Sequence, residues 1–128
     1  MRGVAWYRCG MPSVFIPVHT PTMNEIISWK ASYRSKYNDE KRSFSKVAVP
    51  ILRELGRFDA ARVTLHVVVR SSRMDPDGIC AGAAKFVLDC MVRAGVLPDD
   101  SQRHVLGLSF TWSVNPDSVG CFVLVEPA

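Results

Sequence analysis

The chain has 128 residues, of which 48% are hydrophobic and 22% are charged, a balance that is typical of one globular domain. It is too short for an enzyme with separate cofactor and substrate domains, and too apolar for intrinsic disorder over most of its length. Sixteen Lys and Arg against twelve Asp and Glu give a net charge of +4, which is compatible with a polyanionic partner without requiring one.

Features of a membrane or secreted protein are missing from the sequence. No uncharged apolar run approaches the ~18 residues that a membrane helix needs, so we expect no membrane association. Residues 1–12 lack the apolar core of a signal peptide, because Arg8 and Pro12 interrupt this segment. Residues 1–11 are expected to be weakly ordered. The four cysteines form no CxxC pair, which favours reduced thiols over a structural zinc site. A cytoplasmic location is therefore expected.

The first predicted elements are a short strand and a helix. Residues 13–19 alternate as a strand does, and Pro17 within them indicates an edge position. Thr22 is followed three residues later by Glu25, and this spacing is typical of a capping box at a helix N-terminus. A helix is therefore predicted over 23–37.

A second helix is predicted over 40–55, after a break at Asn38-Asp39. Pro50 lies inside this segment and is expected to kink or split the helix, and Gly56 is expected to end it. The apolar positions recur at helical spacing. The expected buried stripe consists of Phe44, Val47, Ile51 and Leu55.

The clearest strand is predicted over 62–70. Its apolar residues alternate with polar ones, so one face of the strand is expected to be buried. A third helix is predicted from Asp75-Pro76 to Arg93, ended by Gly95. The buried strand positions are expected to be Val63, Leu65, Val67 and Val69, and those of the helix Ile79, Ala83, Phe86, Cys90 and Met91.

Two further strands are predicted over 105–114 and 119–126, joined as a hairpin by the turn at 115–117. Phe110 and Trp112 alternate on the first of them and are expected to be core or dimer contacts. The element order β, α, α, β, α, β, β predicts a single α+β domain over residues 1–128, with a mixed sheet of about four strands and helices packed on it.

Carboxylates are concentrated around the third predicted helix. Asp75 and Asp77 follow the central strand, and because alternate residues of an extended segment point the same way, they can share a focus. Asp99 and Asp100 lie in the loop that leads into the next strand. If the two loops converge, their carboxylates would form a site for Mg²⁺, which prefers oxygen ligands. Lys85, on the helix between the loops, could then neutralise a phosphate or orient a water.

The same residues also have a purely structural interpretation. Acidic residues before a helix are good N-caps and interact favourably with the helix dipole. Asp99-Asp100 is common loop chemistry, and Lys85 with Asp89 could be an ordinary i,i+4 surface pair. Spacing alone does not establish that the two loops approach one another.

The complete motif is more specific than any of its parts. Residues 73–102 read RMDPDGICAGAAKFVLDCMVRAGVLPDDSQ: an arginine-flanked DxD, a helix lysine four residues before the aspartate of LD, an AGV helix end and an acidic pair. This combination resembles the RusA family of Holliday junction resolvases, which are found mainly in phages and prophages. The segment Pro21–Glu25 with Ile26 is similar to the PxxN(D/E)YI segment of some phage members.

The resemblance implies a crossover junction endodeoxyribonuclease, a phosphodiester hydrolase that resolves four-way DNA junctions as a homodimer. It implies Mg²⁺, with Mn²⁺ as a possible substitute, no organic cofactor, and a location in the cytoplasm of a bacterial host. The catalytic residues implied are Asp75, Asp77, Asp100 and Lys85. The metal ligands implied are Asp75, Asp77 and Asp100, with Asp99 as an additional or substitute ligand.

A basic segment adds a candidate DNA-binding surface. Residues 30–57 hold eight Lys and Arg against three Asp and Glu, a local charge of +5 from 8 − 3. Aromatic residues are interleaved with these cations, which suits contact with a DNA backbone without sequence readout; a solvated helix face is the alternative. The expected DNA-binding residues are Lys30, Arg34, Lys36, Lys41, Arg42, Lys46, Arg70 and Arg73.

One alternative function is kept beside the nuclease. Gly78 stands where the family usually has asparagine, and Lys85 comes eight positions after Asp77, a longer interval than in the best-known member. These departures allow a non-catalytic protein that binds DNA junctions and retains the fold.

Overall fold

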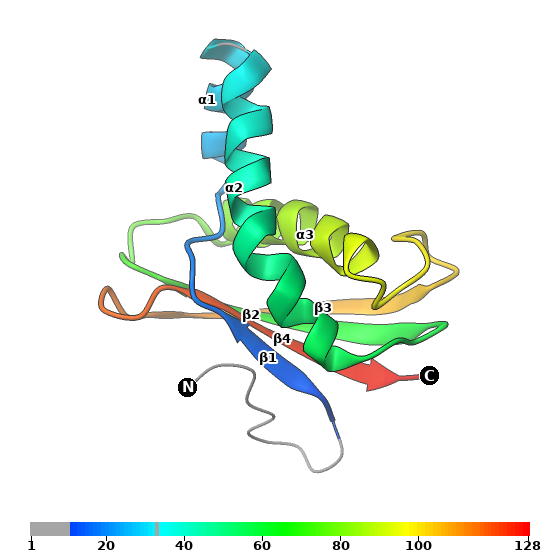
Figure 1. The fold of residues 1–128 in the computed structure, drawn as a ribbon. Helices are drawn as coiled ribbons and strands as arrows, with labels where there is room; N and C mark the ends of the chain where they lie inside the picture. Colours follow the sequence, from blue (N-terminus) through cyan, green and yellow to red (C-terminus); the bar gives the residue numbers. More distant parts are fainter. Residues whose placement is uncertain (1–10, 33) are drawn as a thin grey trace.

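The protein is an α+β domain with its helices on one face of a four-stranded mixed sheet, as predicted (Figure 1). The computed structural model describes residues 11–32 and 34–128, so the expectation for residues 1–10 lies outside the described residues. The elements are β1 (Ser13–Ile16), α1 (Met23–Ser32), α2 (Arg34–Leu52), the 3₁₀ turn η1 (Arg53–Leu55), β2 (Ala61–Val69), α3 (Pro76–Arg93), β3 (Val105–Val114) and β4 (Gly120–Pro127).

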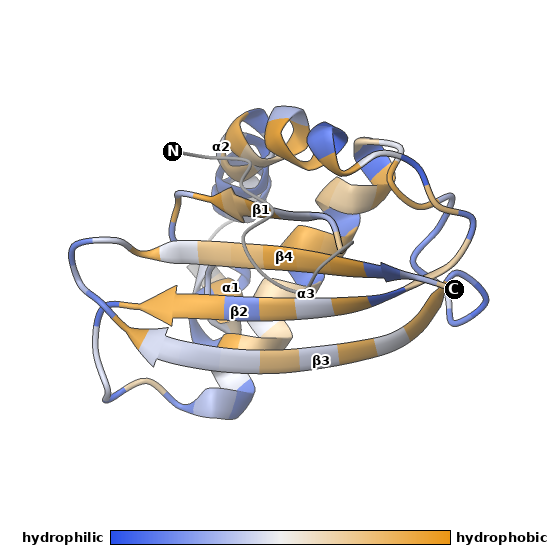
Figure 2. Ribbon diagram, turned by 90° about the horizontal axis from the view of Figure 1, so that it is seen from below, coloured by the Kyte–Doolittle hydropathy of each residue, from blue (hydrophilic) through white to orange (hydrophobic). Residues whose placement is uncertain are grey.

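The strand order in the sheet is β1-β4-β2-β3. β2 and β3 are parallel and are connected through α3, whereas β4 runs antiparallel to both β1 and β2. β2 therefore lies inside the sheet, which agrees with its apolar sequence. Figure 2, seen from the helix-free side, shows β4, β2 and β3 side by side.

The predicted hairpin between the last two strands is wrong, because β2 lies between β3 and β4. The connecting loop passes the end of β2, where the Asn115 N–H donates a hydrogen bond to the Val69 carbonyl at 2.8 Å. The turn residues at 115–117 were correctly identified as a connection, but this connection spans two strand spacings instead of one. Pairing on both sides satisfies the backbone of the most apolar strand.

The core lies between the sheet and the helices. Val63, Leu65, Val67 and Val69 are at most 2% exposed, as the alternation predicted, and so are all five predicted core residues of α3. The ring of Phe86 on α3 lies within 6.3 Å, centre to centre, of three aromatic rings from α1 and α2. This aromatic cluster attaches α1 and the first half of α2, which project away from the sheet in Figure 1, to the rest of the domain.

The two helices at the top of Figure 1 differ from the prediction in their boundary. α2 runs without interruption through the expected break at Asn38-Asp39, because Asp39 pairs with Arg42 and Glu40 with Lys36, at i,i+3 and i,i+4 spacing. α1 ends instead at Ser32.

The C-terminal half of α2 packs on the sheet, and its buried stripe differs from the predicted one at one position. Val47 is 36% exposed, and Ala48, which is fully buried, takes the core position next to it. Pro50 lies inside α2, which continues to Leu52 before tightening into η1. Gly56 then ends the helical segment, as predicted, with a φ of +93° that favours glycine.

Candidate nucleic-acid and metal site

A pocket of about 390 Å³ lies at the end of the sheet where β2 stops and α3 begins. The N-terminus of α1 closes one side of it and the β2–α3 loop the other. This placement agrees with the general preference of ligands for the carboxyl ends of parallel strands. The charged residues that line the pocket are His19, Glu25, Arg70, Arg73 and Asp75.

Asp75 is held in the pocket by its position before a proline. Its backbone is extended, with φ −73° and ψ 131°, as expected for a residue that precedes Pro76. It is the N-cap residue of α3, but its side chain makes no capping hydrogen bond. Asp75 and Asp77 therefore take the N-cap and first-turn positions that the structural interpretation expects, but the Asp75 carboxylate is not used as a cap and remains available to the pocket.

Asp77 lies two residues after Asp75, on the first turn of α3. Its Oδ1 accepts a hydrogen bond from the backbone N–H of Gly78 at 2.9 Å, and both aspartates are exposed. Asp75 lines the pocket, whereas Asp77 is not among its described lining residues. The two carboxylates are thus neighbours with different surroundings.

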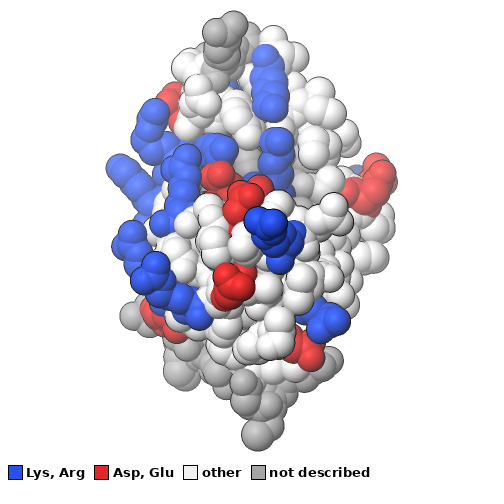
Figure 3. Space-filling view, turned by 90° about the vertical axis from the view of Figure 1, so that its right-hand side faces the viewer, with Lys and Arg blue, Asp and Glu red and all other residues white. Residues whose placement is uncertain are grey.

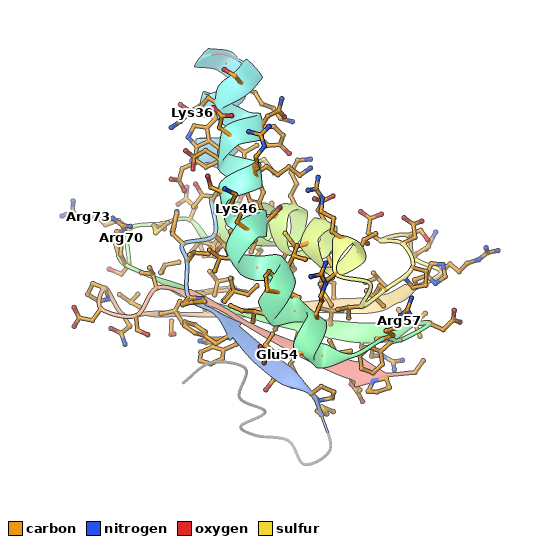
Figure 4. The ribbon with its side chains drawn as sticks, in the orientation of Figure 1. Lys36, Lys46, Glu54, Arg57, Arg70 and Arg73 are labelled. Carbon is orange, nitrogen blue, oxygen red and sulfur yellow. The ribbon has the colours of Figure 1, made fainter. Side chains whose placement is uncertain are left out.

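Arg70 and Arg73 bring positive charge to the same pocket. In Figure 4 both side chains extend outward from the end of the molecule that carries the β2–α3 loop. The backbone N–H of Arg73 donates to Ser71 Oγ at 3.1 Å, which shapes the loop. Neither guanidinium forms an ion pair with a carboxylate of the described residues, so both are open to an anionic ligand.

His19 and Glu25 are the pocket residues that sequence reasoning missed. Glu25 was identified as the partner of Thr22 in a capping box but not as a pocket residue, and the structure confirms the capping box with N–H contacts of 2.9 and 3.3 Å. His19 Nε2 lies 2.8 Å from Glu25 Oε1. Burial alone would raise the pKa of Glu25, but the hydrogen bonds from Thr22 and His19 and the charge of His19 hold this pKa below its usual value. Since about fifty positions separate Glu25 from Asp75, no local pattern could have joined them.

The two acidic pairs do not come together in one chain. Because β2 and β3 are parallel, α3 runs back along the sheet and its two flanking loops lie at opposite ends, as Figure 1 shows. An α-helix rises 1.5 Å per residue, so the 18 residues of α3 separate Asp77 from the Asp99-Asp100 loop by about 27 Å. The described residues contain no group of three or more His, Cys, Asp or Glu side chains placed to hold a metal ion. A single chain therefore does not fit the metal ligand set that the resemblance implies.

Lys85 lies apart from both acidic pairs. It is exposed on α3, eight residues and about 12 Å along the helix axis from Asp77. The alternative interpretation, an i,i+4 pair with Asp89, is wrong, because Asp89 Oδ2 lies 3.1 Å from Arg93 Nε and 3.5 Å from Lys41 Nζ. Within one chain, Lys85 is therefore too far from Asp77 to act on a phosphate or a water beside it.

Four of the expected DNA-binding cations of α1 and α2 have partners inside the chain. Lys36, Lys41 and Arg42 form ion pairs with Glu40, Asp89 and Asp39. The Nζ atoms of Lys30 and Lys41 lie 4.6 and 5.8 Å from the centre of the Tyr37 ring. The side chain of Arg34 lies outside the described part of the chain.

Such surface ion pairs are weak, so a phosphate can compete for the cations that form them. Lys46 is exposed on α2 and has no ion-pair partner among the described residues. Figure 3 shows Lys and Arg gathered along one side of the face that carries the far end of α3, with acidic side chains between them.

The comparisons with known proteins add no family assignment. No protein-family profile matches the chain, and no curated protein sequence matches it. In the part of the chain that the structure describes, no helix is both long and apolar enough to cross a membrane.

Proposed function

We propose that the chain is a structure-selective DNA endonuclease that hydrolyses phosphodiester bonds at four-way junctions with Mg²⁺. The main support is the arrangement of Arg70, Arg73 and Asp75 around one pocket. Guanidinium groups bind phosphate oxygens with paired hydrogen bonds. A carboxylate beside them would weaken simple phosphate binding by repulsion, whereas a Mg²⁺-dependent hydrolytic centre uses carboxylates as metal ligands.

The second support is the composite motif over residues 73–102. Its first aspartate, Asp75, and the flanking Arg73 both line the pocket, and its resemblance to the RusA family supplies the substrate class. The projecting α1–α2 segment offers cations and aromatic rings for contact with the DNA backbone. Backbone contacts of this kind provide affinity without sequence readout.

A second candidate function is a junction-binding protein without cleavage activity. The separation of about 27 Å between the two acidic pairs favours it, since the implied metal ligands are not assembled by one chain. The arginines of the pocket and the cations of α2 serve DNA binding in either case.

Cleavage of a labelled synthetic four-way junction separates the two candidates. We expect symmetric nicks in Mg²⁺ on the junction and none on a linear duplex of the same sequence. Asp75→Asn should lower the cleavage rate at least ~100-fold with unchanged junction affinity, because it removes a group needed in the transition state but not for binding. Asp117→Asn, which neutralises an exposed aspartate in the loop between β3 and β4, is the matched control and should cleave normally.

Tight junction binding without cuts in Mg²⁺ or Mn²⁺ would support the second candidate. Equal affinity for the junction and the linear duplex, again without cuts, would contradict both.

A further inference from the structure

A second pocket lies beside the first, between α1, α2 and the middle of α3. Its volume is about 260 Å³, below the ~300 Å³ at which pockets for drug-sized ligands begin, so it has room for one small ring system. His19 and Glu25 line both pockets. A ligand that extends past these two side chains therefore reaches from the arginines of the first pocket into the second.

Aromatic rings line this second pocket, which is called the aromatic pocket. Phe44 and Phe86 are 6% and 2% exposed, and their rings, 5.5 Å apart from centre to centre, form its inner wall. Trp29 is half-buried, and its ring lies 6.3 Å from that of Phe86. A flat ligand can stack on such a partly open ring, and every nucleobase has a face suited to this contact.

Two partly exposed glutamates give the aromatic pocket hydrogen-bond acceptors. Within the described residues, the hydrogen bonds that Glu25 accepts all end on Oε1, and the ion pair of Glu40 with Lys36 uses Oε2. Each glutamate therefore keeps one carboxylate oxygen for a ligand. The amino groups of adenine, cytosine and guanine donate hydrogen bonds to such oxygens, whereas thymine has no amino group.

We infer that the aromatic pocket takes one unpaired nucleobase that carries an amino group, while Arg70 and Arg73 hold the backbone phosphate beside it. The inference rests on the proposed function, because DNA supplies both groups. Rings and carboxylates alone would also suit a cationic ligand. The neighbouring arginines repel a cation and bind a phosphate, so a nucleotide fits the two pockets together.

Such a pocket gives the chain a means of selecting DNA structure. Extrusion of a base from a duplex costs stacking and pairing free energy, and this cost is smallest where pairing is already interrupted. Phosphate contacts alone do not make this distinction, because every duplex offers the same backbone. Capture of an unpaired base would therefore favour branched or bulged DNA over a continuous duplex.

The first test measures the binding of mononucleotides by NMR, without any cleavage. Deoxyadenosine monophosphate should shift the indole N–H resonance of Trp29 and bind at least ~5-fold more tightly than thymidine monophosphate, because only adenine offers an amino group to the glutamates. Equal affinity for the two nucleotides, or a Trp29 resonance that does not move, overturns the inference.

The second test fills the aromatic pocket from its rim. Ser43 is exposed and lines the pocket, so Ser43→Trp should block it without altering the buried core, and the preference for deoxyadenosine monophosphate should disappear. Ser35→Trp makes the same change at an exposed position in the first turn of α2 and should keep the preference. A preference that survives in Ser43→Trp contradicts binding at this pocket.

The third test uses labelled DNA duplexes that contain one unpaired residue, with divalent metal removed so that nothing is cut. By fluorescence anisotropy, a bulged adenine should bind at least ~5-fold more tightly than a bulged thymine. Trp29→Ala should remove this difference, and Trp29→Phe, which keeps a ring, should retain most of it. Ile27→Ala, which truncates a side chain that is 58% exposed on the same helix, is the matched control. Wild-type discrimination by Trp29→Ala would exclude stacking on this ring.

The outcomes separate this inference from the proposed function. A chain that cleaves four-way junctions but binds the two bulges equally contradicts only the assignment of the aromatic pocket. A chain that prefers the adenine bulge but cleaves no junction in Mg²⁺ or Mn²⁺ contradicts only the endonuclease activity.

Discussion

Two glycines of α3 differ in the space that a Cβ atom would have at their positions. A Cβ at Gly82 would lie 1.9 Å from the carbonyl oxygen of Pro21, whereas at Gly78 the nearest atoms are 4.0 Å away. We expect Gly82→Ala to lower the free energy of unfolding by about 2–3 kcal/mol, since the backbone at Pro21 and Thr22, which leads into α1, must shift away from α3. Gly78→Ala should raise it by up to about 1 kcal/mol through helix propensity. Urea unfolding of both variants measures these changes, and equal effects would contradict the close α1–α3 contact.

Glu25 makes stability depend on pH at the same pocket. Because its pKa is lowered on folding, it stabilises the folded chain above its unfolded pKa, and this contribution is lost as the pH falls through the folded pKa. Glu25→Gln should therefore flatten the decline in unfolding free energy between about pH 5 and 3. The effect should stay below about 1 kcal/mol, because the side chain is 40% exposed and solvent screens it.

The control for this change is Glu54→Gln, which alters an exposed glutamate on η1 (Figure 4). Unfolding free energies of the three proteins over the acidic range provide the comparison. If Glu25→Gln follows the wild-type pH profile, the contacts with Thr22 and His19 do not hold the carboxylate in its charged form.

The local conformation of a residue could be predicted from the sequence where it depends on neighbouring residues in the chain. Thr22 with Glu25, the extended backbone of Asp75 before Pro76, and the helix end at Gly56 all follow from local rules. The shared pocket of Glu25 and Asp75 does not, because it depends on the close packing of α1 on α3. Local chemistry thus identifies the individual groups, and tertiary contacts decide which of them meet.

At the scale of elements, α2 shows that a polar stretch can continue a helix. Asn38 and Asp39 suggested a break, but the ion pairs of their neighbours support the helix through it. In contrast, the apolar periodicity of α3 and the alternation of β2 identified both elements and their buried faces correctly. Apolar periodicity is therefore a more reliable signal than a short polar stretch. Burial of an apolar face in the core stabilises an element by more free energy than one turn of polar residues costs it.

The same element allows a test of DNA binding with two changes of opposite sign. Lys46→Gln removes an exposed cation, so it should weaken junction binding and reduce the slope of log K against log salt by about 1. Glu40→Gln removes the negative charge that lies 3.1 Å from Lys36 Nζ, so it should strengthen binding. Fluorescence anisotropy with a labelled junction at several salt concentrations measures both effects. Changes of the same sign would exclude this face of α2 as a DNA contact.

At the scale of the whole molecule, the parallel pairing of β2 with β3 determines where the candidate site residues lie. The sequence predicted both strands and the helix between them, but it predicted β3 to pair with β4. A hairpin of β3 with β4 would not determine where the Asp99-Asp100 loop lies relative to Asp75. The observed β-α-β unit places this loop at the C-terminal end of α3, opposite the end that carries Asp75. Strand partners depend on contacts between distant segments, so a single sequence specifies them poorly.

β3 is an edge strand with no further strand partner among the described residues, and the homodimer that the resemblance implies predicts a stability that depends on concentration. If two copies fold and pair through β3, mass action stabilises the dimer by about 1.4 kcal/mol for each tenfold increase in concentration. The unfolding midpoint of the wild-type chain should therefore rise by a few degrees per tenfold increase, and that of Trp112→Lys/Val114→Lys should not change. Thermal unfolding followed by circular dichroism at three concentrations measures both midpoints. A wild-type midpoint that is independent of concentration would mean that two copies do not pair through β3.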